Sequence, residues 1–243
     1  MVKVYFWLPS QESLLPRNNN RMRRVGKDMN FSGKNVLVVG ASGGLGKEFT
    51  SVLIASGANV YGTATSNESA AKIPDEAAQK LLLNLESAES IATLANYLNS
   101  AVKLDGVIIA AGLVGFGLAV DTPSEIDAKL LQDNYRGARD LLVALQPNLA
   151  NAESAFVINV TGIVAQMPLP SMSSYSASKM AMHGFLTSVS REWRRSGIKV
   201  VSELLGHTET GLATRAILGQ APQFPQGLSP QDAVAQMLAN LDS

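Results

Sequence analysis

The sequence of 243 residues contains no cysteine and only two histidines, His183 and His207. Without cysteine the chain can form no disulfide, present no thiol nucleophile and hold no zinc through thiolates. Two histidines are too few for a histidine-based metal site or for a serine–histidine–aspartate relay. We therefore expect no metal, and a catalytic centre built from other residue types.

The chain also lacks a net charge and a long apolar run. Basic and acidic side chains number 20 each, so no general attraction to nucleic acid or to an anionic membrane follows. No apolar stretch approaches the ~20 residues that a bilayer-spanning helix needs. Hydrophobic residues make up 46% and charged residues 16% of the chain, which is typical of a well-buried globular protein. We expect a cytoplasmic protein without nucleic-acid or membrane partners.

The charge is uneven along the chain, because residues 1–28 carry six basic and two acidic side chains. This segment has no helical or strand period. Its apolar stretch is too short for a secretory signal, and no small-residue cleavage site follows. A transit-like peptide and a basic interaction arm are alternatives. We favour a disordered basic extension over 1–28 and a single domain over 29–243, opened by Met29.

From Lys34 onward, short apolar runs alternate with longer segments of helical period. The runs are NVLVV, NVYGTA, KLLLNL, GVIIAA, AFVINV and KVVSEL. The segments between them include 45–56, 89–102, 125–145 and 175–195, where apolar residues recur every three to four positions. Alternating strands and helices predict a parallel sheet with helices on both faces. We therefore expect an α/β fold with a Rossmann-like, doubly wound sheet of about six strands.

A glycine-rich turn, GASGGLG at 40–46, joins the first expected strand to the first expected helix. Free backbone N–H groups and the positive helix end make such a junction an anion site. Gly40 allows the tight turn, Gly44 lets a diphosphate approach the backbone, and Gly46 permits close packing of helix on strand. The junction predicts a dinucleotide at this position.

A tyrosine and a lysine, Tyr175 and Lys179, lie four residues apart in YSASK, where the pattern becomes helical. Positions i and i+4 share one face of a helix, so the phenol and the ammonium group come close together. Beside a bound ligand they form an acid next to a cation. Away from a ligand they are an ordinary exposed pair, and the motif alone does not decide between the two.

Five motifs together resemble the short-chain dehydrogenase/reductase family: VGASGGLG, AAG at 110–112, NYRG at 134–137, YSASK, and LGHTET at 205–210. They occur in the family's order and spacing over roughly residues 29–211. MNFSGK and GANVYGTATS look similar to the bacterial 3-oxoacyl-[acyl-carrier-protein] reductases of that family. The resemblance implies an NAD(P)-dependent oxidoreductase that transfers a hydride between nicotinamide and a small carbonyl or alcohol substrate.

The resemblance also implies roles for the catalytic residues. Tyr175 would be the general acid–base, Lys179 would favour the phenolate and grip the ribose hydroxyls, and Asn134 would hold a water of a proton relay. The family's serine, thirteen residues before the tyrosine, is Gly162 here. Three interpretations stay open: Thr161 replaces the serine, the substrate supplies its own hydroxyl, or the chain is a dinucleotide-binding sensor or scaffold with little or no turnover.

The resemblance further implies cofactor contacts at the strand ends. No carboxylate stands at Ala64 to repel a 2′-phosphate, and Thr65 and Ser66 can donate to one. NADP(H) is therefore preferred. NAD(H) remains the alternative, because Gly43 stands where NADP-dependent relatives commonly carry arginine. The implied cofactor residues are Gly40, Ser42, Gly43, Gly44, Leu45, Gly46, Thr65, Ser66, Asn84, Leu85, Ala110, Ala111, Gly112, Tyr175, Lys179, Gly206, Thr208 and Thr210.

The family's substrate loop corresponds to residues 211–230, which are rich in Ala, Leu, Gly and Pro and carry Arg215 as their only charge. Such a loop fits a mostly apolar alcohol or ketone. The last strand, which commonly helps to build tetramers in the family, has no counterpart after 232–241. We therefore expect a homodimer, paired through the helices from Glu125 and Tyr175, rather than the common tetramer.

Overall fold

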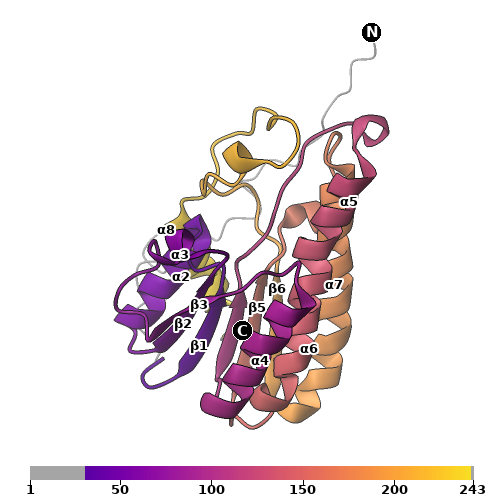
Figure 1. The fold of residues 1–243 in the computed structure, drawn as a ribbon. Coiled ribbons are helices and arrows are strands. Elements are labelled where there is room, and N and C mark those ends of the chain that lie inside the picture. The colour runs from indigo at the N-terminus through magenta and orange to yellow at the C-terminus, as the bar shows by residue number, and fades with distance from the viewer. Residues whose placement is uncertain (1–30, 242–243) are drawn as a thin grey trace.

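The computed structural model describes residues 31–241, so the extension expected over 1–28 lies outside the described residues. Six strands form one sheet in the order β3-β2-β1-β4-β5-β6, and helices cover both of its faces (Figure 1). The strands are β1 (Asn35–Val39), β2 (Asn59–Ala64), β3 (Gln79–Leu82), β4 (Gly106–Ile109), β5 (Ala155–Val160) and β6 (Ile198–Glu203). Every pairing is parallel. The predicted α/β fold is confirmed.

Burial explains why the strands are continuous apolar runs. In the middle of the sheet, Val36 of β1 lies opposite Val60 of β2 and Gly106 of β4, and all of β4 is buried. The edge strand β3 is only partly covered. Central parallel strands are packed on both faces, so alternation of polar and apolar residues is absent where the sheet is deepest.

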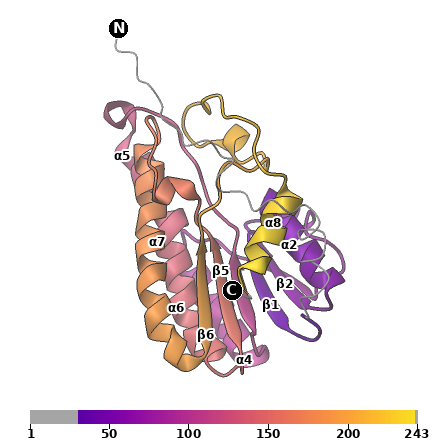
Figure 2. The same ribbon diagram turned by 180° about the vertical axis from the view of Figure 1, so that it is seen from behind.

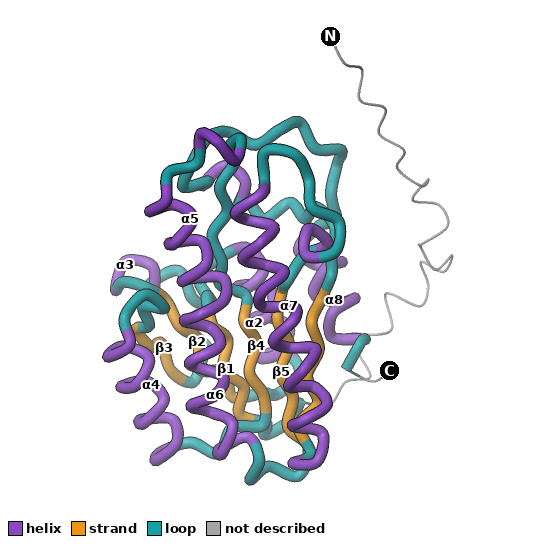
Figure 3. Tube along the Cα trace, turned by 90° about the vertical axis from the view of Figure 1, so that its right-hand side faces the viewer, coloured by secondary structure: helices purple, strands orange, loops and turns teal. Residues whose placement is uncertain are grey.

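Two helical layers enclose the sheet. Helices α2 and α8 cover one face (Figure 2), and α4, α6 and α7 lie side by side on the other (Figure 3). Each layer has its own buried core. The α-helices are α2 (Gly44–Ala55), α3 (Asn67–Ala70), α4 (Ala88–Ala101), α5 (Ser124–Leu131), α6 (Ala138–Leu149), α7 (Ser173–Trp193) and α8 (Pro230–Ala239). No helix between residues 31 and 241 is both long and apolar enough to cross a bilayer.

The helix expected over 125–145 is interrupted. A π-helical segment, η3 (Gln132–Gly137), joins α5 to α6, and such wide turns inside α-helices often mark functional sites. This segment contains Asn134. Short 3₁₀ turns occur at η2 (Ala119–Asp121), η4 (Ile163–Ala165), η5 (Arg194–Ser196) and η6 (Ala213–Arg215).

Candidate active site

The carboxyl ends of the six parallel strands meet at one edge of the sheet. The chain runs outward from β1 through β2 to β3 and then returns to place β4 on the other side of β1. Ligands of doubly wound sheets bind outside the strand ends at such a switch point. Most of the sequence-predicted residues lie in the segments that follow the strands: 40–46 after β1, 65–66 after β2, 84–85 after β3, 110–112 after β4, Thr161 after β5, and 206–210 after β6. Asn134 lies in the π-helical segment, and Tyr175 and Lys179 lie in α7.

The glycine-rich turn after β1 is packed so closely that side chains would not fit. Gly40 has a φ of +81°, and a Cβ there would lie 2.8 Å from the backbone nitrogen of Ala111. A Cβ on Gly46 would lie 2.0 Å from the carbonyl oxygen of Gly40, and one on Gly44 would lie 2.8 Å from Cβ of Thr210. The turn thus brings the ends of β1 and β4 and the loop after β6 into contact.

Helix α2 begins at Gly44 without a capping side chain. Its N-cap residue Gly43 offers none, and the first turn, which includes Leu45, has no acidic residue. The first N–H groups of a helix need an acceptor from outside it, and the helix dipole favours an anion there. An uncapped helix start beside a glycine turn therefore suits the diphosphate of a dinucleotide.

Tyr175 and Lys179 are buried together on α7. The Lys179 ammonium nitrogen lies 5.9 Å from the centre of the Tyr175 ring and donates a 3.0 Å hydrogen bond to the carbonyl oxygen of Val160. Burial lowers the pKa of Lys179 to about 8 and raises the pKa of Tyr175 to about 12. The family resemblance implied that Lys179 favours the phenolate. In the protein alone, desolvation of the phenolate outweighs the lysine.

Asn134 connects the segment that follows β4 to α7 by hydrogen bonds. Its side-chain oxygen accepts from the Leu113 N–H at 2.9 Å, and its amide nitrogen donates to the Leu113 carbonyl at 2.9 Å and to the Ser178 hydroxyl at 3.0 Å. A Cβ on Gly112 would lie 3.0 Å from the Asn134 oxygen and 3.3 Å from the Lys179 nitrogen. The glycine thus lets the amide and the ammonium group share one small space.

Ser178 is a further residue of the candidate site, which was not predicted from the sequence. It is buried, accepts from Asn134, and donates to the carbonyl oxygen of Tyr175 at 2.7 Å. It therefore joins the helix that carries Tyr175 to the segment that carries Asn134. The signal was present in YSASK, because Ser178 lies three residues after the tyrosine and so on nearly the same helical face.

The Thr161 hydroxyl is directed into the sheet. It lies 2.7 Å from the Ser202 hydroxyl and accepts from the side chain of Asn159 at 2.7 Å, and Ser202 in turn contacts His183 at 2.9 Å. The substitution of this hydroxyl for the family's serine stays a prediction, and it would require Thr161 to leave these partners.

Gly162 occupies a backbone conformation that favours glycine, with φ +89°. A Cβ would meet nothing closer than 3.8 Å, so the missing side chain leaves space, and only the backbone angle opposes a serine. The N–H groups of Thr161, Gly162 and Ile163 all donate to carbonyl oxygens of Glu203 or Leu205. The backbone at the end of β5 therefore offers no free donor in place of the serine hydroxyl.

The residues after β2 and β6 use their hydroxyls locally. Ser66 caps α3 by accepting from the Ser69 N–H at 3.2 Å, while Thr65 is exposed. Thr208 donates to the Gly206 carbonyl at 3.3 Å, and the Thr210 hydroxyl accepts from the Leu212 N–H at 3.3 Å. Hydroxyls engaged in this way retain lone pairs or can rotate towards a ligand.

An apolar cluster surrounds the Tyr175 ring. Its buried members are Val114, Phe116, Leu130, Val164, Met172 and Tyr175, and Leu212, Ala213, Ala216 and Ile217 from the loop after β6 pack against them. The loop is tied down by backbone hydrogen bonds from Ile217 to Val114 and from Phe116 to Leu218. The expected apolar substrate loop thus lies over the tyrosine.

Comparison with known proteins agrees with this arrangement. The family model described as short chain dehydrogenase matches residues 34–220. The 3-oxoacyl-[acyl-carrier-protein] reductase FabG of Vibrio harveyi is 31% identical over 78% of this chain and 79% of its own length. FabG of Escherichia coli K12 is 30% identical over 88% and 92%.

A solved structure agrees as well. The crystal structure of a short chain dehydrogenase from Burkholderia cenocepacia J2315, in complex with NADP, superposes with a TM-score of 0.78 at 26% identity, over 88% of this chain and 86% of that one. The match of the family model over most of the chain, together with the fold and the order of the motifs, shows that the chain belongs to the short-chain dehydrogenase/reductase family.

Proposed function

We propose that the chain is an oxidoreductase that uses NADP(H) in preference to NAD(H), acts on a carbonyl/alcohol pair, and has Tyr175 as its general acid–base. The observation that carries this proposal is the burial of Tyr175 and Lys179 together, beside Asn134. They lie at the sheet edge where α2 begins without a cap.

The described residues fit a dinucleotide. The N–H groups at the start of α2 would receive the diphosphate, Asn84 and Leu85 would flank the adenine, and Lys179 would hold the nicotinamide ribose. Gly40 and Gly46 keep this turn narrow, since a Cβ on either would overlap backbone atoms. When bound, the nicotinamide would supply or accept the hydride.

In the direction of reduction, the Tyr175 hydroxyl would give its proton to the substrate oxygen as the carbonyl carbon gains the hydride. The remaining phenolate needs positive charge nearby, because burial holds the pKa of Tyr175 at about 12 in the protein alone. Lowering that pKa by ~3 units takes ~4 kcal/mol. The Lys179 ammonium group would provide part of this stabilisation and would return the proton through groups ordered by Asn134.

The preference for NADP(H) rests on the end of β2. Ala64 ends the strand, and no carboxylate follows before Glu68, so nothing there repels a 2′-phosphate. Thr65 is exposed and Ser66 retains an acceptor and a rotatable hydroxyl. The crystal structure of the Burkholderia relative is described as a complex with NADP, which supports the same choice.

The substrate is inferred to be a mostly apolar ketone or alcohol, because the side chains packed around Tyr175 are apolar. The names of the FabG relatives describe reductases of 3-oxoacyl groups, which also combine a ketone with an aliphatic chain. Arg215 is the only charged side chain of the loop over 211–230.

A second candidate function is a dinucleotide-binding sensor or scaffold with little turnover. Gly162 favours it, because neither a side chain nor a free backbone N–H replaces the serine. Loss of one donor to a developing oxyanion costs ~10²–10³ in rate. Gly162→Ser tests this candidate: a gain in kcat would show that the missing donor limits turnover, even though the backbone angles of φ +89° and ψ 151° cost the variant ~1–3 kcal/mol of stability.

The deciding experiment is a titration of the purified protein with NADPH and NADH, followed by nicotinamide fluorescence and thermal shift, and then a screen of aliphatic ketones and aldehydes. Selective NADPH binding with turnover is the expected result. Selective binding without turnover would favour the sensor or scaffold. If neither cofactor bound, both candidates would be wrong and the glycine turn would be only architectural.

A further inference from the structure

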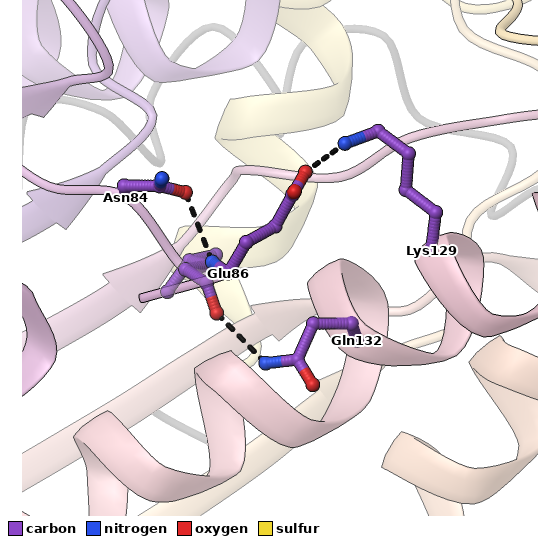
Figure 4. Close-up of polar contacts among 5 residues, drawn as sticks. Asn84, Glu86, Lys129 and Gln132 are labelled. Atoms are coloured by element: carbon purple, nitrogen blue, oxygen red, sulfur yellow. Dashed lines mark hydrogen bonds and ion pairs between the residues drawn. The ribbon is translucent and has the colours of Figure 1, made fainter. Parts of the chain in front are cut away.

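The turn after β3 is held from one side by the π-helical segment. The side-chain amide of Gln132 donates a 3.0 Å hydrogen bond to the carbonyl oxygen of Leu85, as Figure 4 shows. Leu85 is buried, and 47 residues separate the two partners in sequence. The contact therefore fixes the end of an edge strand against a helix on the face of the sheet.

The backbone of Gly137 lies against the same Leu85 carbonyl oxygen. A Cβ on Gly137 would lie 2.1 Å from the Leu85 carbonyl oxygen, so any larger residue would push the turn away. The oxygen thus lies between the Gln132 amide and the bare backbone at Gly137, one at each end of the π-helical segment. Its position is set by this segment rather than by β3 itself.

The turn also carries the exposed side chain of Asn84 and, among the described residues, one backbone N–H without a partner. The Asn84 side-chain oxygen accepts from the Glu86 N–H at 2.9 Å, and the Asn84 N–H donates to the Ser90 hydroxyl at 3.0 Å. Within residues 31–241 no acceptor pairs with the Leu85 N–H. The Leu85 carbonyl is held by Gln132, so the N–H of the same residue is also held in place, and an N–H without a partner can donate to a ring nitrogen of a base.

A second contact reaches the turn but contributes less. Lys129 forms an ion pair with Glu86, as Figure 4 shows, yet both side chains are about 40% exposed, at 39% and 42%. Exposed ion pairs are screened by water and salt and contribute little. The part-buried amide–carbonyl bond of Gln132 is therefore the stronger of the two polar contacts that hold the turn.

We propose that Gln132 is a positioning residue for the adenine end of the cofactor. This inference rests on the proposed dinucleotide function and adds a residue that lies outside the segments at the strand ends. Because Gln132 and Asn134 belong to one π-helical segment, the same six residues order both the adenine side and the catalytic side of the site.

The test removes the donor without changing the shape of the side chain. Gln132→Glu cannot donate at neutral pH, and Gln132→Met removes the donor without adding charge. Three ligands are titrated by calorimetry: adenosine 5′-monophosphate, the preferred dinucleotide, and reduced nicotinamide mononucleotide. We expect both variants to bind the first two about three- to tenfold more weakly, the loss expected for one hydrogen bond. The nicotinamide fragment, which lacks adenine, should bind as it does to the wild type.

Gln146→Glu is the matched control, because Gln146 lies in α6, the helix that continues from the π-helical segment, and its side chain makes no hydrogen bond to the described residues. It should leave all three affinities unchanged. Equal weakening of the adenine and nicotinamide fragments would assign Gln132 a general structural role and overturn the proposal, as would unchanged affinity for adenosine monophosphate. A wild-type protein that bound no dinucleotide would instead overturn the proposed function.

Discussion

At the scale of single residues, the chemistry of the site follows from burial. Tyr175 and Lys179 share one face of α7 beneath apolar side chains, and desolvation opposes the charged form of each. The neutral form of the tyrosine is therefore favoured, and the lysine is only moderately basic. Each of these consequences can be measured.

Tyr175→Phe tests the proton donor. Phenylalanine keeps the ring in the apolar cluster and removes only the hydroxyl, so the fold and the affinity for NADPH should change little. Loss of a general acid typically costs ~10²–10⁴ in rate, and we expect kcat to fall by at least a factor of about 100. Steady-state kinetics and a cofactor titration of the same preparation measure both quantities. Turnover equal to that of the wild type would contradict the mechanism.

Lys179 should make stability depend on alkaline pH. Its pKa in the folded protein is about 8, below the ~10.4 of an unfolded lysine. Between these two values the unfolded chain binds more protons, so the contribution of Lys179 to the free energy of unfolding rises with pH. From pH ~8 to pH ~10 the rise should be about 2 kcal/mol. Tyr175 acts oppositely above pH ~10, because its folded pKa is raised to about 12.

Urea unfolding of the wild type and of Lys179→Met across this range measures the effect. The variant has no proton to bind at this position, so the unfolding free energy of the wild type relative to that of the variant should rise by about 2 kcal/mol from pH ~8 to pH ~10. Lys103→Met, at an exposed position, is the control and should show no such trend. A difference that stays constant with pH would mean that the lysine is solvated in the folded protein.

At the scale of elements, buried amides hold the helices in place. Asn148 of α6 donates to the carbonyl oxygens of Leu98 at 3.1 Å and Val102 at 2.9 Å, and accepts from the Leu104 N–H at 2.9 Å. These backbone groups belong to the end of α4 and the loop before β4. One side chain thus caps a neighbouring helix and fixes a loop at the amino edge of the sheet.

Asn148→Ala should destabilise the protein without affecting the site. The change leaves backbone groups unpaired and buried, at ~1–3 kcal/mol each, and we expect a loss of about 3 kcal/mol in urea unfolding. Cofactor affinity of the folded variant should match the wild type, because the active-site edge lies at the opposite end of the strands. Asn151→Ala, at an exposed position, is the control. A loss as small as that of the control would contradict the capping role.

At the scale of the whole molecule, the sequence predicted the layers better than the contacts between them. The apolar runs NVLVV, NVYGTA and AFVINV match β1, β2 and β5 residue for residue, because central strands are buried on both faces and carry an unmistakable pattern. The π-helical segment was not predicted, since one wide turn leaves the apolar spacing of a helix nearly unchanged. Whether the domain extends over 29–243 stays a prediction.

The site was predictable as a location and less so as a set of hydrogen bonds. Motifs at strand ends must meet at one edge of a parallel sheet, which predicted where the glycine-rich turn and the residues after the other strands lie. That Asn134 and Tyr175 belong to the same site followed from the family resemblance. The partners of Thr161 could not be foreseen, because Ser202 lies 41 residues away. Gln132 was missed for the same reason. The high pKa of Tyr175 depends on burial by several segments that are far apart in the sequence. No local sequence pattern could predict it.

The homodimer expected from the family resemblance is testable on the outer face of the helical layer. Val143 of α6 and Met180 of α7 are 41% and 42% exposed, and Figure 3 shows both helices on the same face of the sheet. A two-fold axis would bring Val143 and Met180 of one copy against the same two residues of the other copy.

Replacing both residues by glutamate would remove buried apolar area and place like charges together, which should weaken dimerisation by on the order of a hundredfold. Light scattering after size exclusion measures this, with Leu82→Glu, 50% exposed on β3, as the control. A monomeric wild type would contradict the expected homodimer, and a double variant that is as dimeric as the wild type would place the interface elsewhere.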